Sequence, residues 1–83
     1  MKLYLISQSQ IIHCDAYDSA VVVAPDEEAA RNTNPCTGGP MVSGDWENFN
    51  YWCSDPERVY VLYLGEAAPD IAPGVVCASF YDD

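Results

Sequence analysis

Hydrophobic and polar positions divide the chain into two well-patterned ends around an irregular middle. Residues 2–8 place tyrosine, leucine and isoleucine in succession before a polar run, which predicts a strand. Residues 19–24 form a continuous alanine and valine run, as expected of a central strand covered on both faces. Two further apolar runs, residues 58–64 and 75–81, predict the last two strands.

A short helix is predicted between the second and third of these strands. Pro25 and the acids that follow it suit a helix N-terminus, residues 29–31 continue the pattern, and Asn34 with Pro35 ends it. The order is β-β-α-loop-β-β. We therefore expect a single α+β domain over residues 1–83, with a four-stranded, mostly antiparallel sheet and one short helix on a face.

The middle, residues 32–57, is dense in asparagine, proline and glycine, which predicts a long irregular loop. Long loops in small domains are often functional. Four large aromatic residues lie in its second half: Trp46, Phe49, Tyr51 and Trp52. Such side chains are common anchors of protein interfaces, and nearby acids would form a charged rim around them. The alternative is that they fold back over the open face of the sheet, and both can hold for different members of the group.

Composition adds a strong imbalance of charge to this framework. The 83 residues include 13 acidic and three basic side chains, for a net charge of −10, although 49% of the residues are hydrophobic and the chain should fold. This balance argues against direct binding of nucleic acid and favours a basic partner surface. A chain this short also buries too little surface for a deep substrate cavity, so we expect no enzyme.

The acidic residues fall into groups that we expect at the surface. The first group surrounds the first half of the fold and consists of Asp15, Asp18, Asp26, Glu27 and Glu28. The second group lies in the irregular middle and consists of Asp45, Glu47, Asp55 and Glu57, and Asp82 and Asp83 end the chain. They could imitate DNA phosphates toward a channel lined by lysine and arginine, or they could only keep the chain in solution.

Cysteine spacing gives no support to a metal or cofactor site. His13 adjoins Cys14, but Cys36, Cys53 and Cys77 follow at intervals of at least 17 residues, without the close pairs typical of zinc sites. We expect His13 in an exposed turn, no catalytic thiol and no cofactor. No membrane span or signal peptide is evident, so we expect a cytoplasmic protein with reduced cysteines, although Cys36 and Cys53 could approach each other.

Roughly half of the chain resembles a known group of sequences. The matching segments are KLYLISQ (2–8), YDSAVVVA (17–24), DEEAAR (26–31), VLYLGEA (61–67) and GVVCASF (74–80). They look like a family of small, largely uncharacterised proteins found in phages, prophages and their hosts. The stretch from Cys36 to Cys53 departs from that family, which usually has a brief connection there.

The resemblance implies a mobile genetic element and supplies no catalytic residues. Small acidic proteins in that setting include anti-CRISPR and other anti-defence inhibitors, some of which are DNA mimics. We therefore expect an anti-CRISPR-like inhibitor that binds a basic surface of a host CRISPR effector complex and blocks target DNA. The alternative is an accessory module of a mobile element, self-associating as a homodimer, whose acids only confer solubility.

Overall fold

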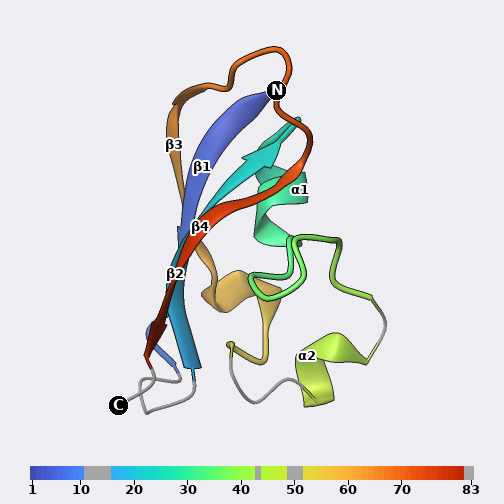
Figure 1. Ribbon diagram of the computed structural model, residues 1–83. Helices are drawn as coiled ribbons and strands as arrows, with labels where there is room; N and C mark the ends of the chain where they lie inside the picture. Colours follow the sequence, from blue (N-terminus) through green and yellow to red (C-terminus); the bar gives the residue numbers. More distant parts are fainter. Residues whose placement is uncertain (11–15, 43, 49–51, 82–83) are drawn as a thin grey trace.

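The fold is one four-stranded antiparallel sheet with short helical segments on one side (Figure 1). The computed structural model describes residues 1–10, 16–42, 44–48 and 52–81. The strands are β1 (Lys2–Ser7), β2 (Ala16–Ala24), β3 (Tyr60–Glu66) and β4 (Gly74–Tyr81), in the order β3-β1-β2-β4. This arrangement confirms the predicted α+β fold and its β-β-α-loop-β-β order.

The predicted helix is present and short. Helix α1 (Glu27–Arg31) begins after Asp26, whose carboxylate accepts a hydrogen bond from the Ala29 backbone N–H at 2.8 Å. That bond satisfies one of the free N–H groups of the first turn, which explains why the helix begins there. A helix of five residues is too short to be stable alone, so it depends on packing against the sheet.

The middle is less irregular than predicted. It contains helix α2 (Asp45–Asn48) and the 3₁₀ turn η1 (Pro56–Arg58), and Thr33 pairs with Pro40 in an isolated β-bridge. The turn η1 occupies the start of the run predicted as the third strand, because Asp55 caps it and Pro56 suits its first position. The strand β3 therefore begins at Tyr60.

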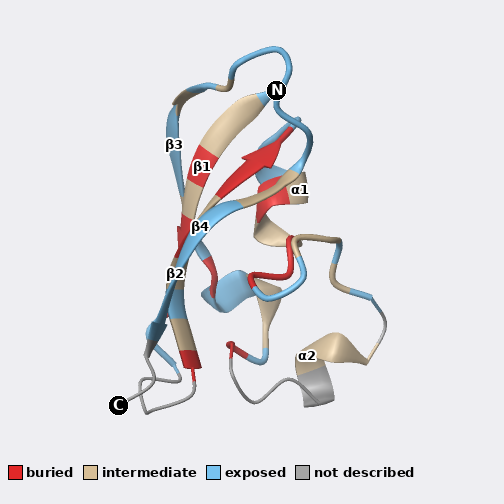
Figure 2. Cartoon of the chain, in the orientation of Figure 1, coloured by how far each residue is buried: buried red, intermediate tan, exposed pale blue. Residues whose placement is uncertain are grey.

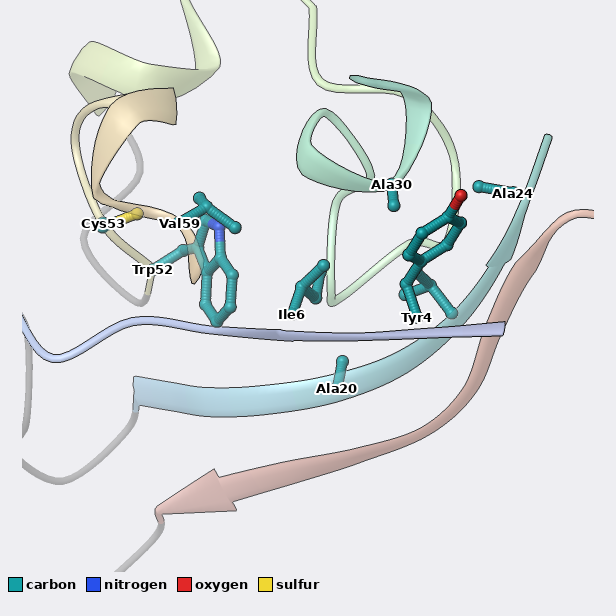
Figure 3. Close-up of a cluster of buried hydrophobic side chains, with 9 residues drawn as sticks. Tyr4, Ile6, Ala20, Ala24, Ala30, Trp52, Cys53 and Val59 are labelled. Atoms are coloured by element: carbon teal, nitrogen blue, oxygen red, sulfur yellow. The ribbon is translucent and has the colours of Figure 1, made fainter. Parts of the chain in front are cut away.

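The hydrophobic core lies between the sheet and these helical segments (Figure 3). Tyr4 and Ile6 from β1 alternate toward it, because successive side chains of a strand point to opposite faces. Ala20 and Val22 join them from β2 and Ala30 from α1. The middle of the chain completes the core with Trp52, Cys53 and Val59.

Among the residues that the structure describes, no second layer of helices or strands packs on the opposite face of the sheet (Figure 1). Val21 on this face is only half-buried, and its neighbours Leu5 and Ser19 are half-buried as well (Figure 2). The expectation that the second strand is covered on both faces is therefore wrong over this part of β2. Val23 on the same face is buried, as is Val22 on the core face, so the uncovered part of β2 ends before Val23. The valine run is the same on both faces, and composition alone did not show which part lacks a cover.

The loop before α2 contacts the sheet through its backbone. Gly38 has a φ of 81°, and a Cβ at this position would lie 3.3 Å from the Val75 backbone nitrogen. Both the positive φ and this close approach favour glycine.

None of the helices described is long and apolar enough to cross a membrane.

Candidate protein-binding site

Acidic residues from two separate segments meet on the helix side of the molecule. Helix α1 supplies Glu27 and Glu28 with its cap Asp26, and η1 supplies Glu57 with its cap Asp55. We call these five residues the acidic surface. Asp26, Glu27, Glu28 and Glu57 are exposed, and Asp55 is half-exposed.

Arg31 joins the two segments. Its Nη1 donates to the carbonyl oxygens of Pro56 at 3.0 Å and Val59 at 2.6 Å, and its Nη2 lies 3.4 Å from Glu27 Oε1. These bonds span 25 and 28 residues of sequence. They bring the acids of α1 and η1 together, which the sequence did not show.

An open depression of about 580 Å³ marks the junction between the segments, and its lining is Glu28, Arg31, Pro56 and Glu57. Two carboxylates therefore border one guanidinium, which already pairs with Glu27. Because the depression is open and Arg31 is engaged, the site suits the side chains of a basic protein surface better than a buried small molecule.

Backbone and side-chain hydrogen bonds orient several of these carboxylates. Asp26 accepts from the Ala29 N–H at 2.8 Å, and Asp55 accepts from the Glu57 N–H at 2.9 Å. Glu28 Oε1 accepts from Asn32 Nδ2 at 3.3 Å. Binding to carboxylates that are already oriented costs less side-chain entropy than binding to carboxylates that must first be ordered.

Two other predicted acids that the structure describes, Asp45 and Asp18, do not belong to this surface. Asp45 begins α2, where its carboxylate accepts from the Val42 N–H at 2.8 Å, and Asp18 is exposed on β2. Helix α2 lies apart from α1 in Figure 1. Asp15, Asp82, Asp83 and the side chain of Glu47 lie outside what the structure describes.

The structure describes two of the four loop aromatics, and one of them is buried and cannot contact a partner. Trp52 is 0% exposed and packs in the core, and Trp46 is half-buried and packs against that core. The expectation of a partner contact is therefore wrong for Trp52, and the alternative that it folds back onto the sheet applies. The physical reason is that α1 covers only part of the sheet, and a tryptophan buries a large apolar area over the rest. Phe49 and Tyr51 lie outside the described residues.

The Trp52 indole has one unusual feature. Its Nε1–H is buried, and it has no hydrogen-bond partner in the described part of the chain. Buried indole N–H groups usually have a partner, so packing of the ring must offset the lost bond with water.

The cysteines that the structure describes are free thiols. Cys36 and Cys77 are exposed, whereas Cys53 is buried and donates weakly to the Asp55 carbonyl at 3.5 Å. Burial raises the pKa of the Cys53 thiol. Cys36 and Cys53 are therefore not paired here, and His13 and Cys14 lie outside the described residues. Among the described residues, no group of three or more His, Cys, Asp or Glu side chains is placed to hold a metal ion.

Sequence reasoning missed two features of the molecule. The first is the role of Arg31 as a link between α1 and η1, for which the only local signal was its spacing of four residues from Glu27. The second is that described residues brought side by side on the sheet face opposite the core, such as Leu5, Val21 and Cys77, are uncharged, which depends on strand register. Comparisons of the chain with protein families, with curated proteins and with solved structures found no match.

Proposed function

We propose that this protein is a non-catalytic inhibitor. Through its acidic surface it binds a basic, DNA-handling surface of a host complex and blocks target DNA there, in the manner of a DNA mimic. The observation that carries the proposal is the meeting of α1 and η1, which gathers carboxylates from two segments beside one neutralised arginine. The resemblance to phage and prophage proteins makes a CRISPR effector complex the target to test first.

The charge balance supports this mode of binding. Of the three basic residues in the chain, Arg31 is paired with Glu27, which leaves Lys2 and Arg58 to offset the remaining carboxylates. A protein channel that binds DNA gains affinity by pairing lysine and arginine with phosphates. Carboxylates on a rigid surface can form the same charge-assisted hydrogen bonds.

The test is a gel-shift assay of target DNA with a purified type I CRISPR surveillance complex, with and without this protein. We expect loss of the shifted band at about 50 mM salt and partial recovery at about 300 mM, because salt screens exposed charges. An unchanged band, with no comigration of the protein and the complex, would exclude this target.

Neutral substitutions in the acidic surface test the role of charge directly. Glu28→Gln and Glu57→Gln each remove one carboxylate at the depression, and each is expected to weaken inhibition about two- to fivefold at low salt, corresponding to about 0.4–1 kcal/mol. The control is Asp70→Asn, an exposed acid in the β3–β4 connection outside the acidic surface. Equal effects of all three substitutions would show that net charge, and not this surface, is responsible.

The second candidate function is an accessory module of a mobile element, in which the acids only confer solubility. The hydrogen bonds that Asp26, Asp45 and Asp55 accept from backbone N–H groups favour it, because they give these acids a role in the fold. This candidate predicts that Glu28→Gln and Glu57→Gln leave every partner interaction unchanged.

A further inference from the structure

The sheet face opposite α1 has a composition unlike the rest of the molecule. Strand register places its residues in three rows that each cross all four strands. The rows are Gly65-Leu3-Val23-Gly74, Leu62-Leu5-Val21-Cys77 and Tyr60-Ser7-Ser19-Ser79. We call these twelve residues the open face, and none of them carries a charge in a chain of net charge −10. Val23 in the first row is buried, so the exposed surface lies in the other two rows.

The middle row is the most apolar part of the open face. Leu62 is 58% exposed, Cys77 is exposed, and Leu5 and Val21 between them are half-buried. A shallow concavity of about 170 Å³ lies along β2 and β4, with Leu5, Val21 and Cys77 in its lining. Soluble monomeric proteins rarely expose contiguous apolar surface, and where they do it often marks an interaction site.

We propose that two copies of this chain pair through their open faces. The charge distribution selects this occupant, because two molecules of net charge −10 repel each other and can approach closely only through surface without carboxylates. A basic partner, by contrast, would gain nothing from an uncharged face. Asp18 precedes Ser19 at the β-bulge that borders the third row, so an exposed carboxylate lies at this edge of the face.

Geometry supports packing of sheet on sheet. Two sheets pack face to face about 10 Å apart, with side chains of the two inner faces interdigitated. The leucine and valine side chains of the middle row would form the dry centre of that contact. The hydroxyl groups of Ser7, Ser19, Ser79 and Tyr60 would supply a polar rim.

The size of the face predicts a weak dimer. The two exposed rows cross four strands about 4.8 Å apart and span about four residues of each strand, which gives about 250 Å² of flat area per copy. With side-chain relief, a pair buries about 600 Å² in total, which is below the size of most specific interfaces. We therefore expect a weak, reversible dimer with a dissociation constant of about 100 μM or above.

The test is sedimentation equilibrium of the full chain alone, from about 1 μM to about 1 mM, at low and high salt. We expect the dimer fraction to rise with concentration and also with salt, because screening weakens the repulsion between the two acidic copies. A chain that stays monomeric at the highest concentration and salt would overturn the proposal.

Two substitutions on the open face and one matched control locate the contact. Leu62→Glu and Ser79→Glu place a charge at exposed positions of β3 and β4, and each should raise the dissociation constant at least tenfold. Val42→Glu is the control and adds the same charge in the loop on the helix side, at a residue that is 59% exposed. It should change the dissociation constant of the dimer less than twofold. Circular dichroism checks that each variant folds.

A dimer that survives both open-face substitutions would also overturn the proposal and would assign the contact to the edge of β3 or β4. No partner protein enters this experiment. Its outcome is therefore independent of whether the acidic surface inhibits a CRISPR complex.

Discussion

At the scale of single residues, several side chains selected for their chemistry serve the fold first. Asp26, Asp45 and Asp55 each accept a hydrogen bond from a backbone N–H at the start of a helical segment. Trp52 and Cys53, in the segment expected to bind a partner, are fully buried. In the described part of this segment, a partner could contact the neighbouring acids and the exposed part of the half-buried Trp46 side chain.

Cysteine reactivity provides a prediction at this scale. With iodoacetamide at about pH 8, Cys36 and Cys77 should be alkylated well before Cys53, because burial raises the Cys53 thiol pKa and also blocks the reagent. Peptide mass spectrometry over a time course measures the order of labelling. Addition of urea should abolish the difference, and equal rates in the native protein would contradict the burial of Cys53.

At the scale of elements, α1 depends on contacts beyond its own five residues. Ala30 packs in the core, and Arg31 bonds to two carbonyl oxygens of the segment that leads into β3. These contacts position the acids of α1 next to those of η1. Stability of this helix and assembly of the acidic surface therefore rest on the same side chain.

Replacing Arg31 tests whether the stability of the fold depends on these contacts. Arg31→Met should lower the free energy of unfolding by about 2–4 kcal/mol, because it removes two charge-assisted hydrogen bonds and leaves partly buried carbonyls unpaired. Arg58→Met makes the same charge change at an exposed residue, so it should cost less than about 0.5 kcal/mol. Urea denaturation compares the two variants, and equal losses would show that charge, not the Arg31 contacts, matters.

At the scale of the whole molecule, the sheet separates two surfaces of opposite character. The acidic surface lies on the side of the sheet where α1 packs (Figure 1), and strand register places the uncharged rows of the open face on the other side. Salt should weaken binding through the first and strengthen pairing through the second. A dimer would display two acidic surfaces at once, which raises apparent affinity for a target with two basic sites.

The separation predicts that the two properties can be altered independently. Leu62→Glu should weaken the dimer at least tenfold, while each copy keeps its inhibition of DNA binding at protein concentrations below the dissociation constant. Glu28→Gln with Glu57→Gln should weaken inhibition and leave the dimer unchanged or slightly stronger, because it reduces repulsion. Sedimentation and gel-shift assays on the same samples measure both, and a substitution that changes both properties strongly would contradict the separation.

Local patterns in the sequence were enough to predict the four strands and helix α1, but not α2 or η1. Apolar runs mark strands wherever they pack, and Pro25 with three following acids marks a helix start by local hydrogen bonding and charge. The same patterns placed the second strand, but they did not show that one of its faces stays uncovered.

The charge of −10 and the absence of close cysteine pairs also come from the sequence alone, and they direct attention to basic protein partners. Tertiary structure decided which acids meet, because the Arg31 bonds to Pro56 and Val59 join segments more than 20 residues apart. It also decided that Trp52 is core and that the open face carries no charge. Both depend on strand register and on which layer covers which face, and such long-range packing leaves no local pattern in the chain.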